Sequence, residues 1–129
     1  KYIYGDKSLL QETSILNINK KNYVLGGAAN VAYNVKGYDL DVYLCGILGN
    51  DYCGNKIREL LNNNSIDFLG ILSKSRKTTV KTRVICNDQQ IIRIDEEDDY
   101  DLTSEEENNL LKKSSANSYF FRLFERSLH

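Results

Sequence analysis

The stretch that decides the fold is Val24-Leu25-Gly26-Gly27-Ala28-Ala29-Asn30-Val31-Ala32. An apolar pair leads into two glycines, and an apolar-periodic run follows, which is typical of an extended segment turning sharply into a helix. Glycine permits positive φ and close approach of a ligand, and the free N–H groups at a helix start can donate to ligand oxygens. The alternative is an ordinary glycine-led helix start packed on a sheet.

The spacing of this bend favours a sugar over a dinucleotide. It differs from the Gly-x-Gly-x-x-Gly pattern of dinucleotide-binding turns. Ala28 and Ala29 keep the approach open, and Asn30 in the first helical turn offers one acceptor and two donors. The vicinal hydroxyls of a sugar match such a set, so we predict that this bend contacts a carbohydrate.

Composition narrows the class of protein. The 129 residues allow one domain of moderate size or part of a larger one, and the hydrophobic content of 41% can build a core. The net charge of -1 gives no case for nucleic-acid binding. No apolar run approaches the roughly 20 residues needed to cross a bilayer. The chain begins at Lys1 without a methionine, so we expect its natural start to lie outside this sequence.

The cysteine and histidine content disfavours disulfides and metals. Cys45, Cys53 and Cys86 are scattered, with no C-x-x-C pair, which is typical of reduced thiols in a cytoplasmic protein. The only histidine is His129, at the last position. We therefore expect a cytoplasmic protein with no metal site in this chain and with neither nucleic acid nor membrane as a partner.

Hydrophobic patterning predicts alternating strands and helices up to residue 72. The order of strand, helix, strand, helix and strand is the signature of right-handed β-α-β units. The continuous apolar run 42–48 suggests a parallel sheet buried on both faces. Strands are predicted at 14–19, 23–25, 41–48 and 66–72, a turn at 19–22, and helices at 28–36, ended by Gly37, and 52–62, capped by Asp51. Residues 1–6 could be a loop or the tail of a strand.

Residues 77–86 and 89–95 predict a β-hairpin around Asn87-Asp88. Four charged residues lie within its strands, all at odd positions: Lys81, Arg83, Arg93 and Asp95. A loop with an odd residue count would place them on one face, and a two-residue loop would split them. Either the hairpin presents a solvated outer face, or it is a lid over an anionic, hydroxyl-bearing ligand, since arginine binds phosphate bidentately.

The last part of the chain carries one clear helix signal. Thr103-Ser104-Glu105-Glu106 fits a capping box and predicts a helix to about residue 114. The acidic run 96–101 before it is typical of a solvated loop. The aromatic segment 118–128 fits either a strand or a helix end.

Taken together, these motifs resemble the ribokinase-like (PfkB) sugar kinases over roughly residues 1–95. The resemblance rests on the glycine bend, the strand into Gly46 and Gly49, Thr78-Thr79-Val80-Lys81-Thr82-Arg83-Val84 and Gln89-Gln90-Ile91-Ile92-Arg93-Ile94-Asp95. It implies an α/β fold: part of a doubly wound, mainly parallel sheet with a small β lid. Residues 1–116 would then be the N-terminal part of a kinase domain, with lid strands at about 14–25 and 77–95, and 117–129 a divergent tail.

The resemblance also implies a site and a reaction. Gly26, Gly27 and Asn30 would contact the sugar. The lid candidates are Lys81, Arg83, Gln90, Arg93 and Asp95, with the cations assigned to a 7-phosphate from their charge. The motifs are most similar to the branch of the family that uses ATP and Mg²⁺ to phosphorylate the anomeric hydroxyl of D-glycero-β-D-manno-heptose 7-phosphate, in ADP-heptose and lipopolysaccharide-core synthesis. Family lids often pair with a second subunit, so a homodimer through the lid is expected.

Departures from the family limit the expectation for this chain alone. Asp39 stands where the family has glycine or serine, and nothing here resembles the family's Gly-Ala-Gly-Asp anion hole, whose aspartate is the catalytic base. We therefore expect no catalytic residue and no nucleotide site within this chain, and no activity from it alone. The alternatives are another PfkB sugar or nucleoside kinase and a non-catalytic sugar-phosphate-binding or dimerising module.

Overall fold

The computed structural model describes residues 1–8 and 15–115, which form two compact units. Unit 1 comprises Lys1–Val24 and Thr79–Glu96, and unit 2 comprises Leu25–Thr78 with the segment from Glu97 onward. The predicted tail at 117–129 and the aromatic segment 118–128 lie outside the described residues.

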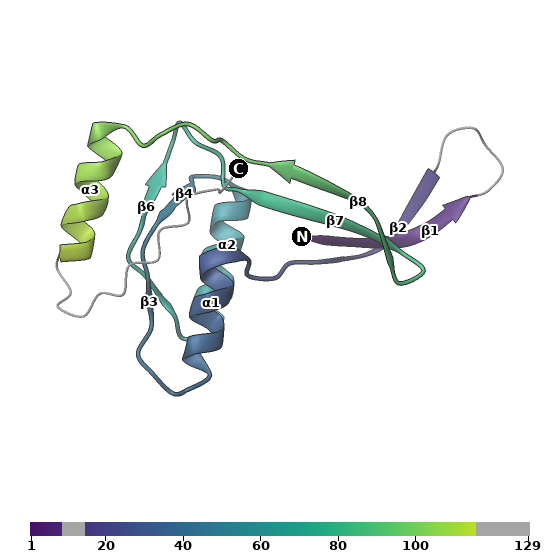
Figure 1. The fold of residues 1–129 in the computed structure, drawn as a ribbon, viewed down its shortest axis with the longest axis horizontal. Coiled ribbons are helices and arrows are strands. Elements are labelled where there is room, and N and C mark those ends of the chain that lie inside the picture. Colours follow the sequence, from purple (N-terminus) through teal and green to yellow (C-terminus); the bar gives the residue numbers. More distant parts are fainter. Residues whose placement is uncertain (9–14, 116–129) are drawn as a thin grey trace. The chain divides into compact units, whose positions relative to one another are not determined.

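Unit 1 is a four-stranded sheet (Figure 1). Its strands, in the order β2-β1-β7-β8, are β2 (Ile15–Asn22), β1 (Tyr2–Ser8), β7 (Val80–Cys86) and β8 (Gln89–Glu96). The pairs β1–β2 and β7–β8 are antiparallel, and β1–β7 is parallel. The hairpin β7–β8, hereafter the lid hairpin, therefore belongs to the same sheet as β1 and β2, and this sheet includes none of the strands of unit 2.

The N-terminal strands differ from the sequence prediction. Residues 1–6 belong to a strand, and the predicted turn at 19–22 and strand at 23–25 are both wrong, because β2 continues to Asn22 and no strand follows it. Pairing with β1, in which Tyr4 faces Lys20 and Tyr2 faces Asn22, holds this polar segment extended. Exposed lysines are common on edge strands, where they discourage pairing with other chains.

The lid hairpin turns through Asn87 and Asp88, as predicted. Both residues have positive φ, 49° and 60°, as a two-residue type I′ turn requires. A two-residue turn was expected to split the four charged residues between faces, and this expectation is wrong. A bulge shifts the register between Val84 and Ile85 and leaves Ile91 of β8 without an opposite residue. Because of this extra residue, Arg83 is paired with Arg93 and Lys81 with Asp95, so the four charged residues share one face.

Unit 2 contains three helices and two pairs of short parallel strands in the described residues. Its elements are α1 (Gly27–Lys36), β3 (Tyr43–Leu44), β4 (Ile47–Gly49), α2 (Tyr52–Asn63), β5 (Asp67–Phe68), β6 (Ile71–Ser73) and α3 (Ser104–Ser115). Strand β3 pairs with β5, and β4 pairs with β6. The strands predicted at 41–48 and 66–72 are thus parallel, as expected, but each is interrupted. The interruption lies where the backbones come close, since a Cβ at Gly70 would overlap the carbonyl of Gly46.

The strands of unit 2 lie between α3 on one side and α1 and α2 on the other (Figure 1). The buried core on the α1 and α2 side consists of Ala32, Leu61 and Ile66. Leu25, Ala29, Val42, Leu44, Ile57 and Phe68 pack against it. Burial on both faces was predicted for 42–48, and it fails at Tyr43, which is 44% exposed. Side chains alternate along a strand, so Tyr43 points away from the core that Val42 and Leu44 join.

The helix boundaries follow their capping signals. Helix α1 ends at Lys36 before Gly37, and the Asp51 Oδ1 accepts a hydrogen bond of 2.7 Å from the Gly54 N–H at the start of α2. In α3, Thr103 Oγ1 accepts from the Glu106 N–H and Glu106 Oε2 accepts from the Thr103 N–H, which is a capping box. These predictions are confirmed. No helix in the described part of the chain is long and apolar enough to span a membrane.

Candidate substrate-binding site

The glycine bend, Gly26–Gly27, is open to solvent. Gly27 has a φ of 50°, in the left-handed region that favours glycine, and starts α1. Gly26 is the extended N-cap residue, and its carbonyl accepts from the N–H groups of Ala29 and Asn30 at 3.1 and 3.2 Å. Among residues 1–8 and 15–115, a Cβ built on Gly26 would meet no atom within 4 Å. None of these residues fills the space over Gly26, which a ligand could therefore occupy.

Asn30 lies exposed in the first turn of α1. Its carbonyl accepts a hydrogen bond of 2.9 Å from the Asn34 side-chain amide. Within the described ranges, the side-chain amide of Asn30 itself makes no hydrogen bond. Both its donors and its acceptor can therefore serve a hydroxyl-bearing ligand.

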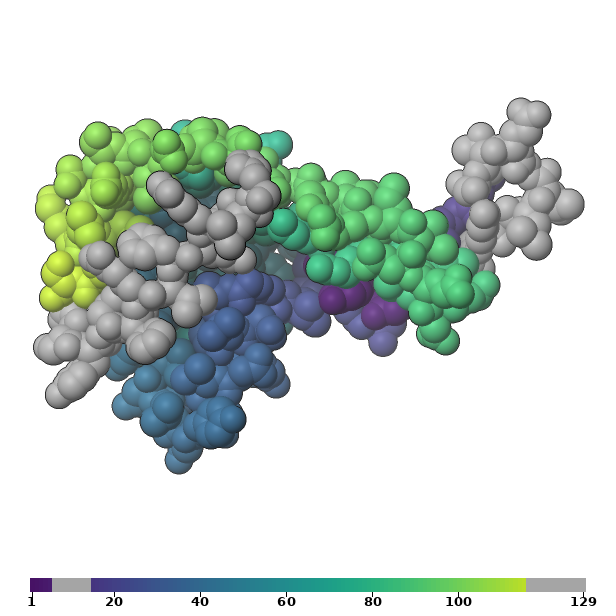
Figure 2. Space-filling view, viewed as in Figure 1, coloured from purple at the N-terminus to yellow at the C-terminus, as the bar shows by residue number. Residues whose placement is uncertain are grey.

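The second group of candidates forms the charged face of the lid hairpin, which we define as the face that carries Lys81, Arg83, Arg93 and Asp95. Asp95 binds two cations, with Arg93 Nε at 2.9 Å from Oδ1 and Lys81 Nζ at 3.6 Å from Oδ2. Arg83 lies directly opposite Arg93 in the register. Gln90 faces Ile85, two residues along β7 from Arg83. All of β8 is exposed, and the green atoms in Figure 2 show the hairpin at the surface of unit 1.

Arg83 is the unneutralised cation of this face. Among the described residues it makes no ion pair, and its guanidinium carbon lies 5.7 Å from the centroid of the Tyr2 ring. Like charges directly opposite each other in a sheet are destabilising. Asp95 thus pairs with Lys81 and Arg93 but not with Arg83, and the guanidinium of Arg83 keeps a positive charge that an anion such as phosphate would neutralise.

The sequence-predicted site residues divide between the two units. Gly26, Gly27 and Asn30 lie at the start of α1 in unit 2. The other five, Lys81, Arg83, Gln90, Arg93 and Asp95, lie in unit 1. The structure thus groups each set within its own unit.

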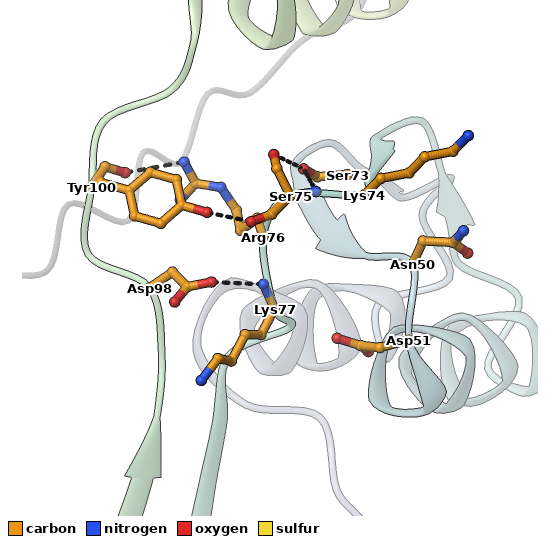
Figure 3. Close-up of a pocket in the computed structure, with 9 residues that line it drawn as sticks. All are labelled: Asn50, Asp51, Ser73, Lys74, Ser75, Arg76, Lys77, Asp98 and Tyr100. Carbon is orange, nitrogen blue, oxygen red and sulfur yellow. Dashed lines mark hydrogen bonds between the residues drawn. The ribbon is translucent and has the colours of Figure 1, made fainter.

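Unit 2 also has a polar hollow of about 430 Å³ (Figure 3). It is lined by Asn50, Asp51, Ser73, Lys74, Ser75, Arg76, Lys77, Asp98 and Tyr100. The Arg76 guanidinium lies 4.4 Å from the Tyr100 ring centroid and donates to the carbonyls of Tyr100 and Asp101 at 3.0 and 3.2 Å. In the described residues, Arg76 Nε is the one buried side-chain polar atom without a hydrogen-bond partner.

The remaining polar groups of the hollow do not converge on its centre. The side chains of Lys74 and Lys77 point away from each other in Figure 3. Asp98 Oδ2 accepts from the Lys77 N–H at 2.7 Å, and the Tyr100 hydroxyl donates to the Ser75 carbonyl at 2.7 Å. These bonds join residues 75–77 to residues 98–101, so we interpret the hollow as a structural junction.

Asp51 binds Thr78, two residues before the lid hairpin begins at Val80. Its Oδ2 accepts from the Thr78 N–H and its Oδ1 from the Thr78 hydroxyl, both at 2.8 Å. The Thr78 Oγ1 also accepts from the Gly49 N–H at 2.9 Å. Burial raises the pKa of Asp51, but hydrogen bonds from the Thr78 and Gly54 backbones and the Thr78 hydroxyl outweigh it, so this pKa lies below its usual value.

Glu106 is a buried carboxylate held in a similar way. The Ser73 hydroxyl donates to its Oε1 at 2.7 Å, and Arg76 lies 3.8 Å from its Oε2. The Ser73 hydrogen bond, with the Thr103 N–H and the charge of Arg76, lowers the pKa of Glu106. Glu106 thus stays ionised and joins α3 to β6.

Sequence reasoning missed two residues of interest. Tyr2 lies beside Arg83. The alternation of Tyr2 and Tyr4 around Ile3 is typical of a strand and could have indicated that Tyr2 belongs to a sheet. Thr78 donates a hydrogen bond to Asp51, which lies 27 residues away in the sequence, and no local sequence pattern indicates this contact.

No metal site is evident in the part of the chain that the structure describes. No group of three or more histidine, cysteine, aspartate or glutamate side chains is placed to hold an ion.

Comparison with known proteins places the chain in a family. Residues 2–123 match the model of the pfkB family carbohydrate kinases. The chain is 42% identical over 100 residues to the bifunctional protein HldE of Helicobacter pylori strain P12 and 35% identical to HldE of Helicobacter hepaticus. These matches cover 74% of this chain and 22% and 21% of the two relatives. The chain thus spans about a fifth of the length of the curated relatives it matches.

Solved structures share the fold. A carbohydrate kinase from Agrobacterium tumefaciens has a TM-score of 0.63 at 16% identity, over 74% of this chain and 32% of that one. A Staphylococcus aureus protein provisionally assigned as a phosphofructokinase has a TM-score of 0.65 at 20% identity, over 87% of this chain and 36% of that one. The fold is therefore ribokinase-like and mixed α/β, and the chain belongs to the pfkB family of carbohydrate kinases.

Proposed function

We propose that this chain is the sugar-recognition part of an ATP-dependent kinase that phosphorylates the anomeric hydroxyl of D-glycero-β-D-manno-heptose 7-phosphate. The observation that carries the proposal is the charged face of the lid hairpin, where Arg83 and Arg93 lie opposite each other and, of these two, only Arg93 has a carboxylate partner among the residues that the structure describes. Arginine forms bidentate, charge-assisted hydrogen bonds with phosphate. We assign these cations to the 7-phosphate.

The sugar itself is assigned to the glycine bend. The open space at Gly26 and the unengaged side chain of Asn30 support contact with sugar hydroxyls. ATP, bound with Mg²⁺, would supply the phosphoryl group, and phosphoryl transfer depends mostly on positioning and electrostatic stabilisation. This chain would provide positioning, while the base and the nucleotide pocket are assigned to sequence outside it.

The test compares heptose 7-phosphate with unphosphorylated heptose as ligands of the chain in titration calorimetry. We expect Arg83→Ala and Arg93→Ala to weaken binding of heptose 7-phosphate about tenfold or more, and to leave heptose binding nearly unchanged. Arg58→Ala, on the exposed surface of α2, is the matched control and should change neither. Equal weakening for both ligands would contradict the phosphate assignment and favour another PfkB substrate, such as an unphosphorylated pentose or a nucleoside.

A second role, dimerisation, is supported by the other face of β8. Ile92 and Ile94 alternate with the charged residues and remain 52% and 47% exposed. Exposed apolar side chains on an edge strand favour pairing with another copy. We propose a homodimer through the lid hairpin. In analytical ultracentrifugation, Ile94→Lys should shift the chain towards monomer, whereas Ile18→Lys, a similarly exposed position on the opposite edge strand β2, should not. A strictly monomeric wild type would contradict this role.

A further inference from the structure

Tyr2 lies in a row with the two arginines of the charged face. In the register, Tyr2 of β1 is paired with Arg83 of β7, and Arg83 is paired with Arg93 of β8. Paired residues project to the same side of a sheet. The aromatic ring therefore adjoins Arg83, which has no carboxylate partner within the described part of the chain.

The contact between Tyr2 and Arg83 is a cation–π interaction. The guanidinium carbon lies 5.7 Å from the ring centroid, within the roughly 6 Å range over which such contacts are significant. Tyr4 lies beside Tyr2 on the same strand, with ring centroids 6.4 Å apart and an interplanar angle of 23°. Tyr4 is paired with Ile85, so it lies two residues further along β1 than Tyr2 does.

An aromatic partner differs chemically from a carboxylate. Asp95 binds Arg93 through the Nε–H, so it both neutralises that cation and occupies one of its donors. A ring face attracts the guanidinium charge through its quadrupole and leaves the charge in place. Because the five N–H donors of a guanidinium lie in its own plane, a cation held by a ring can still present them to an anion.

We propose that Tyr2 is a positioning residue for phosphate binding: its ring holds the Arg83 guanidinium in place while leaving the charge and hydrogen-bond donors for the substrate phosphate. This inference rests on the proposed function, because it assumes that Arg83 binds the phosphate. It adds a residue from β1, outside the lid hairpin, to the phosphate site.

The test uses three variants of the full chain: Tyr2→Leu, Tyr2→Phe and, as a matched control on the same strand, Tyr4→Leu. Calorimetry measures binding of heptose 7-phosphate and of heptose, and thermal unfolding verifies that each variant is folded. Tyr2→Leu should weaken heptose 7-phosphate binding about three- to tenfold and leave heptose binding unchanged. Tyr2→Phe keeps the ring and should stay within about twofold of wild type.

The mobility of Arg83 provides a readout that needs no ligand. Heteronuclear NMR of the arginine Nε–H groups should show greater motion of Arg83 in Tyr2→Leu, but not in Tyr2→Phe or Tyr4→Leu. Unchanged Arg83 mobility in folded Tyr2→Leu would overturn the inference, whatever calorimetry shows. An equal effect of Tyr4→Leu would overturn it as well, since general loss of sheet packing would then explain the change.

The outcomes separate this inference from the proposed function. If Arg83→Ala removes the preference for heptose 7-phosphate and Tyr2→Leu does not, the role of Tyr2 is wrong and the proposed function stands. If Arg83→Ala leaves the preference intact, or wild type binds neither ligand, the phosphate assignment fails, and the proposed role of Tyr2 fails with it.

Discussion

Arg76 in unit 2 and Arg83 in unit 1 show two uses of the same side chain. Arg76 donates to two backbone carbonyls, contacts Tyr100 and lies near Glu106, so its charge holds its own unit together. Arg83 contacts an aromatic ring and, in the described residues, has no ion-pair partner. Arg76 thus serves the structure of unit 2, whereas we propose that Arg83 keeps its charge for a ligand.

Loss of the unit 2 core should have the largest effect on stability. Leu61 is 1% exposed, and Leu61→Ala should lower the free energy of unfolding by about 2–5 kcal/mol through lost burial and the cavity left behind. Ile92→Ala in unit 1, where the side chain is half exposed, is the matched control and should cost less than about 1 kcal/mol. Urea denaturation measures both, with hydrogen exchange of backbone amides in α2 reporting on unit 2 and in β7 reporting on unit 1. Similar costs for the two would contradict the contrast between the units.

Loss of the buried Thr78 hydroxyl should have the second-largest effect on stability. Thr78→Val leaves the Gly49 N–H without its side-chain acceptor and removes one of the hydrogen bonds to Asp51 Oδ1, so we expect the free energy of unfolding to fall by about 1–3 kcal/mol. Thr79→Val, at the adjacent exposed position, provides the control and should be close to neutral. If both substitutions are neutral in urea denaturation, the Asp51–Thr78 contact has no structural importance.

Acid should weaken unit 2 through its buried carboxylate. The folded-state pKa of Glu106 lies below the ordinary 4.5, so the unfolded state binds more protons on acidification. The stability that Glu106 provides is therefore complete above about that ordinary value and is lost as the pH falls through the lowered folded-state pKa. Denaturation across this range should show a shallower pH dependence in Glu106→Gln than in wild type, while the exposed control Glu107→Gln keeps the wild-type slope. A Glu106→Gln slope equal to that of wild type would show that this carboxylate does not drive acid unfolding.

The smallest effect on stability is expected at Arg83. Removing a cation that faces another cation should change the free energy of unfolding by no more than about 0.5 kcal/mol. Arg76→Ala removes hydrogen bonds and a buried contact, so it should cost clearly more. Thermal and urea unfolding of the two variants measure this difference in stability. A greater loss of stability in Arg83→Ala than in Arg76→Ala would contradict the contrast between the two arginines.

Local signals in the sequence predicted the local features of the fold. The end of α1 at Gly37, the Asp51 and Thr103 caps and the Asn87-Asp88 turn depend on a few neighbouring residues, and each was found. Family resemblance added the fold class and the site candidates, whose roles stay predictions.

Features that depend on pairing between distant segments could not be predicted. Strand β2 continues through polar residues because β1 pairs with it, and the bulge opposite Val84 that unites the charged face follows from register. Tyr2 is near Arg83 in space and 81 positions away in sequence. No composition or periodicity indicates such contacts.

The most direct test of the account is a titration of the chain with heptose 7-phosphate, followed by NMR of the Nε–H groups of its arginines. The account predicts that the signals of Arg83 and Arg93 shift as the ligand binds and that the signal of Arg76 stays in place. Shifts at Arg76 with none at Arg83 and Arg93 would contradict it, because the polar hollow of unit 2 would then be the anion site.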